Sequence, residues 1–194
     1  MPDLQTRLMA ALSAEGSASS DFDLNKDVKA PDIPLTKASV LVAVREETEK
    51  LILTKRSARL KHHPGQIAFP GGKQDPGDPT PEAAALREAE EEIGLSRDRA
   101  QILGTLPAHQ TVTGYSVTPV LAILRGDLQF VPEAGEVSEV FEVPLAHVMN
   151  PDNFLIEGRR WQGRKRYYYT VPYGPYYIWG ATARILRALA ARMS

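Results

Sequence analysis

The residues best suited to chemistry lie in one acidic stretch, Arg87-Glu88-Ala89-Glu90-Glu91-Glu92-Ile93-Gly94. In a helix, Glu88 and Glu92 project from the same face with Glu91 alongside, because residues three and four apart are neighbours. Like charges at this spacing repel, and a cation among them would reverse the penalty. Carboxylate oxygens suit Mg²⁺ or Mn²⁺. The spacing also predicts that Arg87 pairs with Glu91.

A simpler interpretation is that the acidic run is a solvated helix face, which is the usual outcome for such a run. The segment Phe69-Pro70-Gly71-Gly72, a short distance upstream, favours the functional interpretation. Glycines let the backbone approach a metal or a phosphate closely, although a glycine pair alone is more often a turn. Together, the glycines and the acids predict a loop and a helix that share one site.

Composition limits the other kinds of chemistry. The chain of 194 residues has no cysteine, which excludes disulfides, thiolate metal sites and a cysteine nucleophile. No Ser/His/Asp arrangement is evident in the sequence, so that water activated by a metal is the best supported nucleophile. A net charge of -1 gives no overall attraction to nucleic acid or membrane. Without a long apolar stretch or a basic start leading into one, we expect a soluble, cytoplasmic protein with no membrane partner.

The elements that must position these residues form a mixed pattern. We expect an N-terminal helix and linker over 1–35, and one domain over 36–194. The helix that carries the acids is predicted to begin near Pro79-Thr80-Pro81 and to end at Gly94. Other predictions are strands at 38–44, 51–54, before Pro70, 101–106, 116–124 and 137–143, a hairpin of 154–161 and 164–171 around Gln162-Gly163, and a closing helix at 181–193. Irregular alternation favours an α+β fold, with a mixed sheet packed between helices.

The acidic helix and the segment before it resemble a known motif. Gly72, five residues, Asp78, eight residues and then Arg87 to Leu95 resemble the Nudix box, which has glutamate in place of Asp78 and a spacing one residue shorter. The resemblance implies an α/β/α sandwich. It also implies that Glu88 and Glu92, supported by Glu91, ligate Mg²⁺ or Mn²⁺ while water attacks a diphosphate. A later glutamate often serves such enzymes as a further ligand or base, and the candidates are Glu136 and Glu139.

The residues before this motif indicate a substrate. Leu53-Thr54-Lys55-Arg56, then Leu60-Lys61-His62-His63-Pro64-Gly65-Gln66, then Phe69-Pro70-Gly71-Gly72 are similar to the signature of the coenzyme A pyrophosphatases in the Nudix family, which usually has arginine in place of Lys61. That similarity implies cleavage of coenzyme A to 3′,5′-ADP and 4′-phosphopantetheine. The alternatives are another diphosphate, such as ADP-ribose, a dinucleotide or an oxidised nucleoside triphosphate, and a nucleotide-sensing module that does not cleave its ligand.

A substrate with a diphosphate and a further phosphate needs cations beyond the metal, and Arg56, Lys61 and His63 cluster in sequence to supply them. With Gly71 and Gly72, they are the predicted substrate-binding residues. The alternative is that Arg56 and Lys61 are solvated charges and that His63 is a hydrogen bonder in a loop.

The basic and aromatic hairpin admits two interpretations. Its arginines and Tyr167-Tyr168-Tyr169 could bind RNA, but such a hairpin is more often half buried, with its tyrosines packed and its arginines in water. We therefore do not expect a nucleic-acid partner. Tyr173, Tyr176, Tyr177 and Trp179 are expected to be core or dimer contacts, so that a homodimer is possible.

Overall fold

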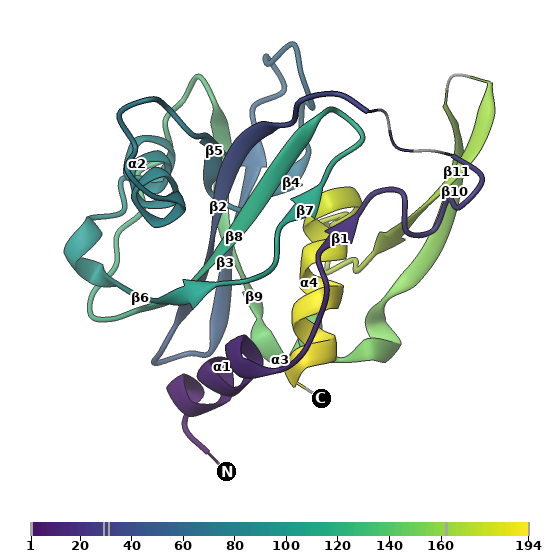
Figure 1. Ribbon diagram of the computed structural model, residues 1–194. Helices are drawn as coiled ribbons and strands as arrows, with labels where there is room; N and C mark the ends of the chain where they lie inside the picture. The colour runs from purple at the N-terminus through teal and green to yellow at the C-terminus, as the bar shows by residue number, and fades with distance from the viewer. Residues whose placement is uncertain (1, 29, 31, 162, 194) are drawn as a thin grey trace.

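A mixed sheet forms the centre of the molecule (Figure 1). The computed structural model describes residues 2–28, 30, 32–161 and 163–193. The helices are α1 (Leu4–Ser13), α2 (Pro81–Ile93), α3 (Leu145–Met149) and α4 (Gly180–Met193), with short 3-10 turns at Arg97–Arg99 and Pro151–Asn153. The strands are β1 (Ser19–Ser20), β2 (Thr36–Arg45), β3 (Lys50–Arg56), β4 (Ile67–Ala68), β5 (Gly71–Lys73), β6 (Ala100–Thr105), β7 (His109–Gln110), β8 (Tyr115–Leu124), β9 (Val137–Pro144), β10 (Leu155–Trp161) and β11 (Arg164–Thr170).

Strands β2 and β8 are the parallel pair at the middle of the sheet. Strand β3 pairs antiparallel with β2 and with β9, and β6 pairs antiparallel with β8. Leu41, Val42, Ala43 and Val44 of β2 are all fully buried, as expected for a strand covered on both faces. The short β5 pairs with the other half of β2, which fixes Gly71 and Gly72 against the sheet.

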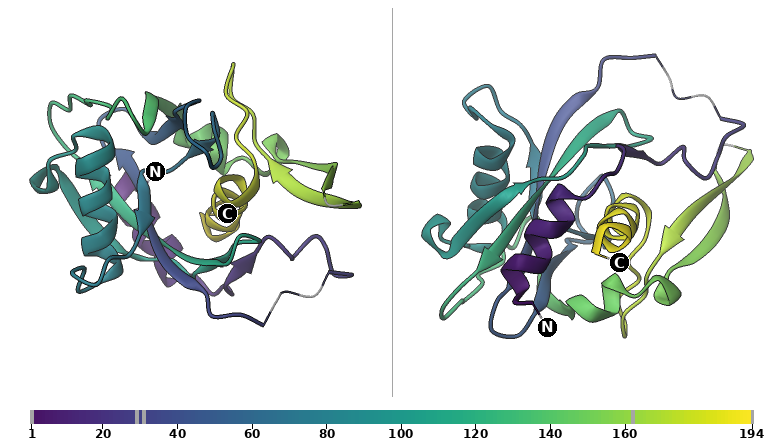
Figure 2. Two further views of the ribbon diagram at one scale, coloured as in Figure 1. Left: turned by 90° about the horizontal axis from the view of Figure 1, so that it is seen from above. Right: turned by 60° about the horizontal axis from the view of Figure 1, so that its bottom comes forward.

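Helices cover both faces of the sheet, with α2 on one side and α1 and α4 on the other (Figure 2). On the first side, Ala85, Ala89 and Ile93 of α2 pack in one apolar cluster with Leu41 and Ile52. On the second side, a larger cluster joins α1 and α4 to the sheet through Leu4, Leu8, Val42, Leu121, Ile185, Leu186 and Leu189. The expected α/β/α sandwich with an N-terminal helix is therefore confirmed.

The helix that carries the acids begins and ends close to its predicted limits. The Thr80 hydroxyl accepts a hydrogen bond from the Ala83 amide at 3.2 Å, and Pro81 occupies the first turn, where it needs no amide partner. Gly94 ends the helix with a φ of 66°, a conformation that glycine adopts without strain. These two caps fix the ends of the helix, and the packing of its apolar face on the sheet turns Glu88 and Glu92 toward β5.

The predicted hairpin forms as β10 and β11, a separate two-stranded sheet beside α4. Gln162 of the expected turn lies outside the described residues. In the N-terminal stretch that was predicted to be a linker, residues 19–20 form β1, which pairs with β7. None of the helices in the described part of the chain is long and apolar enough to span a bilayer.

Candidate active site

Glu92 lies under the glycine loop with little access to water. Its side chain is 5% exposed, and its Oε2 atom accepts a hydrogen bond from the Gly71 amide at 3.0 Å. The other carboxylate oxygen, Oε1, is 3.8 Å from Nη1 of Arg56. The predicted proximity of the acidic helix and the glycine loop is therefore present in the structure, and Arg56 brings a positive charge to the same place.

Glu88 lies one turn earlier on α2 and faces Gly72. A Cβ atom placed on Gly72 would come within 2.6 Å of both carboxylate oxygens of Glu88. Only glycine at this position leaves room for the carboxylate. The pair of glycines thus serves both acids, since Gly71 donates to Glu92 and Gly72 makes space for Glu88.

Arg87 holds the outer side of the acidic cluster together. Its Nη1 atom is 3.0 Å from Glu91, as the helical spacing predicts, and 3.1 Å from Glu88. Its Nε and Nη2 atoms donate to Asp78 at 3.1 and 2.9 Å, and Nη2 also donates to the Lys73 carbonyl. Asp78, which stands where the Nudix box has glutamate, is thus the main partner of Arg87. The side chain of Glu91 is directed to Arg87 and is 60% exposed.

The surroundings raise the pKa of both inner acids. Burial raises the pKa of Glu92 to about 7, against the lowering effect of the Gly71 amide, and the charges of Glu88 and Glu136 raise it further. Burial also raises the pKa of Glu88, while the adjacent Arg87 opposes the shift. Two half-buried or buried carboxylates that face each other gain from a cation between them.

The donor set fits a hard divalent cation, because it consists of carboxylate oxygens with perturbed pKa values. Glu88 and Glu92 are the residues that would hold it. Across the described residues, no group of three or more His, Asp or Glu side chains is gathered closely enough to form a metal site on its own. The predicted role of Glu91 as a third ligand stays a prediction.

The two later glutamates differ in their surroundings. Glu139, on β9, accepts a hydrogen bond from the Tyr176 hydroxyl at 2.5 Å, and the Tyr176 ring is stacked on Phe141 at 3.6 Å. Glu136 is exposed at the loop before β9, and its charge raises the pKa of both Glu88 and Glu92. Its carbonyl accepts from the Ser57 amide at 2.7 Å, which fixes this loop beside the end of β3.

The predicted substrate-binding cations divide into two positions. Arg56 is at the acids, and the loop that follows returns to it, since the Arg56 amide donates to the Gln66 carbonyl and the Gly65 amide donates to the Arg56 carbonyl. His63 is in this loop with a φ of 53°, and its pKa is lowered by partial burial of the ring and by the charge of Arg56. Lys61 is exposed in the same loop and is not among the described residues that line the neighbouring pocket.

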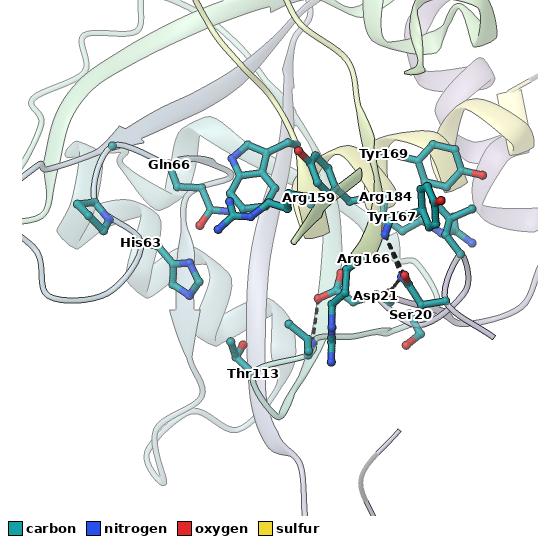
Figure 3. Close-up of a pocket in the computed structure, with 18 residues that line it drawn as sticks. Ser20, Asp21, His63, Gln66, Thr113, Arg159, Arg166, Tyr167, Tyr169 and Arg184 are labelled. Carbon is teal, nitrogen blue, oxygen red and sulfur yellow. Dashed lines mark hydrogen bonds between the residues drawn. The ribbon is translucent and has the colours of Figure 1, made fainter. Parts of the chain in front are cut away.

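That pocket has a volume of about 500 Å³, within the usual range for small-molecule sites. Figure 3 shows His63 and Gln66 on one side of it and Tyr167, Tyr169 and Arg184 on the other. Tyr173 and Tyr176 pack against the core as expected, whereas Trp179 lines the pocket. Sequence reasoning missed the pocket because its walls come from five separate segments of the chain.

The N-terminal segment closes one wall of the pocket. The Asn25 side chain donates to the Tyr167 carbonyl and accepts from the Tyr167 amide, both at 2.9 Å. Asp21 lies 3.0 Å from Nε2 of His109, whose other ring nitrogen is 2.9 Å from the Ser19 hydroxyl. This Ser/His/Asp arrangement was not evident in the sequence. Because Ser19 and His109 are buried, it serves to fix the segment and not as an accessible nucleophile.

A helix with one buried and one half-buried glutamate, placed under a glycine loop at the edge of a mixed sheet, is a site suited to metal-dependent hydrolysis of phosphate anhydrides. Comparison with known proteins identifies the family. The model of the NUDIX domain matches residues 35–167, and the chain belongs to the Nudix hydrolase family.

Curated relatives match over most of both chains. An uncharacterized Nudix hydrolase, NudL, from Enterobacter sp. is 40% identical over 158 residues, which is 81% of this chain and 82% of the relative. NudL from Escherichia coli is 41% identical with the same coverage. Among solved structures, the Nudix hydrolase RenU from M. smegmatis has 28% identity and a TM-score of 0.48. The matched region covers 58% of this chain and 73% of the RenU chain. Members of this family typically depend on a divalent metal.

Without metal, the stability of the protein is expected to fall as the pH rises. Glu92 ionises near pH 7 in the folded state and near 4.5 in the unfolded state, so that folding takes up a proton between these values. Above pH 7, the ionisation of Glu92 lowers the free energy of unfolding by about 3 kcal/mol relative to pH 4.5. Thermal unfolding in a chelator should show a midpoint lower by roughly 6–12 °C at pH 8.5 than the value at pH 5.

Two additions make this measurement specific to Glu92. The Glu92→Gln variant should lose most of the pH dependence and should exceed the wild type in stability at pH 8.5. Excess Mn²⁺ should raise the midpoint of the wild type alone. A wild type and variant with parallel pH profiles would contradict the assignment.

Proposed function

We propose that this Nudix hydrolase cleaves the diphosphate of coenzyme A to 3′,5′-ADP and 4′-phosphopantetheine. The observation that carries the proposal is the position of Arg56, the arginine of the signature at 53–72, which lies 3.8 Å from the buried Glu92. The loop of the same signature joins this acid site to a pocket with several cations. A substrate with a diphosphate and a separate phosphate monoester matches both parts.

The residues divide the work as follows. Glu88 and Glu92 hold the divalent cation, Mg²⁺ or Mn²⁺, which when bound neutralises phosphate charge and lowers the pKa of water. Arg87 forms ion pairs with Glu88 and Glu91 and fixes their side chains. The Gly71 amide orients Glu92, and Arg56 offers a charge to the diphosphate from the opposite side. The reaction adds water across one phosphoanhydride bond, and the products leave as two phosphate monoesters.

Of the two later glutamates, we assign the general base to Glu136. Its carboxylate charge acts on both inner acids, whereas Glu139 is engaged with Tyr176. Glu136→Gln should lower kcat by about 10²–10³-fold, which is the usual contribution of a general base. Glu139→Gln, the matched control, should stay within about tenfold of the wild type. Equal losses in the two variants, or a larger loss for Glu139→Gln, would reverse the assignment.

The proposed substrate is tested by a product assay with the purified protein and Mg²⁺ or Mn²⁺. Coenzyme A, ADP-ribose, a diadenosine dinucleotide and an oxidised nucleoside triphosphate are compared by kcat/KM, and the products are separated by chromatography. We expect a preference of at least about tenfold for coenzyme A, equivalent to about 1.4 kcal/mol in the transition state. A preference for ADP-ribose would make ADP-ribose the substrate in place of coenzyme A. Metal binding with no turnover of any compound would favour a sensing module.

The matched relatives are bacterial, and a cytoplasmic location stays a prediction.

A further inference from the structure

Half of the described lining of the pocket comes from parts of the chain that flank the family match. The match covers residues 35–167. The described lining includes Asp21 and Asn25 before it, and Tyr168, Trp179 and Arg184 after it. The shared domain supplies the loop at 63–66 and the hairpin arginines. Recognition in this pocket is therefore a property of these added segments as much as of the shared fold.

The lining gathers positive charge in an unusual arrangement. Arg159 on β10 and Arg166 on β11 both line the pocket and are directly opposite each other in the strand register. The two guanidinium groups therefore bring positive charge to the same wall of the pocket. Arg184 is already paired with Asp23 at 2.6 Å. The described lining has three arginines and one acid, Asp21, and when Asp23 is also counted against Arg184 one positive charge is left over, so that the pocket favours an anion.

The same wall also carries aromatic side chains. The Trp179 ring is 5.2 Å from the Tyr168 ring and is tilted to it by 62°, and the Arg159 guanidinium carbon lies 5.2 Å from the Trp179 centroid. Aromatic rings next to arginines suit a base that carries a phosphate. An extended apolar arm with amide groups has no need of paired arginines.

The pocket is also within reach of the acid site. The Arg56 amide donates to the Gln66 carbonyl and the Arg56 carbonyl accepts from the Gly65 amide, and both of these partners line the pocket, while the Arg56 side chain is at Glu92. The side-chain amide of Gln66 lies close to Gly180, the first residue of α4, since its nitrogen is 3.8 Å from the position that a Cβ atom on Gly180 would occupy. The 63–66 loop therefore connects a wall of the pocket directly to the strand end that carries Arg56.

We propose that this pocket binds the phosphorylated nucleoside end of the substrate, with the base against Tyr168 and Trp179 and the phosphate monoester beside Arg159 and Arg166. The identity of the ligand rests on the proposed function. In this arrangement the pantetheine end points away from the hairpin and does not contact Arg159.

The test is calorimetric binding of 3′,5′-ADP, 5′-AMP and 4′-phosphopantetheine to the full chain in a chelator. We expect 3′,5′-ADP to bind at least about tenfold more tightly than 5′-AMP. Arg159→Ala should weaken 3′,5′-ADP by about tenfold, as expected for loss of a charge-assisted hydrogen bond. Arg160→Ala is the matched control, because this exposed neighbour on β10 is not among the lining residues, and it should change binding by less than twofold.

Several results would overturn the inference. These are equal affinity for 3′,5′-ADP and 5′-AMP, equal effects of Arg159→Ala and Arg160→Ala, or a response to Arg159→Ala by 4′-phosphopantetheine alone. The binding result and the cleavage assay are separable. Selective 3′,5′-ADP binding without cleavage of coenzyme A would remove the proposed reaction and keep the pocket. Cleavage of coenzyme A together with 3′,5′-ADP binding that is unchanged in Arg159→Ala would keep the proposed reaction and remove the proposed role of the pocket.

Discussion

Glu92→Gln is expected to lower turnover of the diphosphate substrate by about 10³-fold or more while the protein remains folded. The loss corresponds to about 4 kcal/mol in the transition state. The neutral amide removes the charge that attracts a divalent cation, yet it keeps an oxygen that can accept from the Gly71 amide. Because Glu92 is buried with a raised pKa, removing its charge should not weaken the fold.

Glu90→Gln is the matched control for this variant. Glu90 is on the same helix and is exposed, and it pairs with Arg97 at 2.8 Å instead of facing the glycine loop. Its replacement should leave kcat within about twofold, because exposed ion pairs contribute little. Steady-state kinetics at saturating metal measures both variants, and circular dichroism verifies their folding. If Glu92→Gln kept wild-type turnover, the residue would have no part in the mechanism.

The second large effect is expected from Gly72→Ala, which should reduce kcat by about 10²-fold without unfolding the protein. The added methyl group would displace the Glu88 carboxylate, which lies 2.5–2.6 Å from the new Cβ position. The end of a glutamate side chain can move at small cost to stability, but a shift of about 1 Å at a catalytic group costs on the order of 10² in rate.

Gly71→Ala is expected to act on folding instead. Its Cβ would lie 2.4 Å from the Ser39 carbonyl oxygen and 2.6 Å from Cα of Val40, and both are backbone atoms of β2. Gly71 also has a φ of 152°, a backbone conformation that residues other than glycine rarely adopt. We expect a loss of about 3 kcal/mol in the free energy of unfolding. Chemical denaturation and kinetics on both variants separate the two effects, and equal stability losses would contradict the distinction.

Local sequence signals predicted the helix that carries the acids and the loop above it. The caps at Thr80 and Gly94 and the Arg87–Glu91 pair depend on neighbours within a few residues, so that their spacing in the sequence is enough to place them. The long strands of the sheet were also predicted, because their apolar residues are continuous, as in β2, or alternate with polar ones, as in β9. The short strands β1 and β7 were not, since each has only two residues and no periodicity to detect.

Contacts between distant segments explain what the sequence could not predict. Asn25 fills a place on the edge of β11 that a backbone strand would otherwise occupy, and nothing around residue 25 indicates this pairing. The difference between Glu136 and Glu139 likewise depends on Tyr176, almost 40 residues farther along the chain. Trp179 resembles a core residue in the sequence, and only the position of the hairpin makes it part of a pocket wall.

The central claim is that Glu88 and Glu92 together hold the divalent cation, and Mn²⁺ binding measured by electron paramagnetic resonance tests it without reference to any substrate. At pH 8, where Glu92 is ionised, the wild type and Glu90→Gln should remove free Mn²⁺ from solution with the same affinity. Glu88→Gln and Glu92→Gln should each bind at least about tenfold more weakly. If all four proteins bound Mn²⁺ equally well, the cation would be held elsewhere and the account of this site would be wrong.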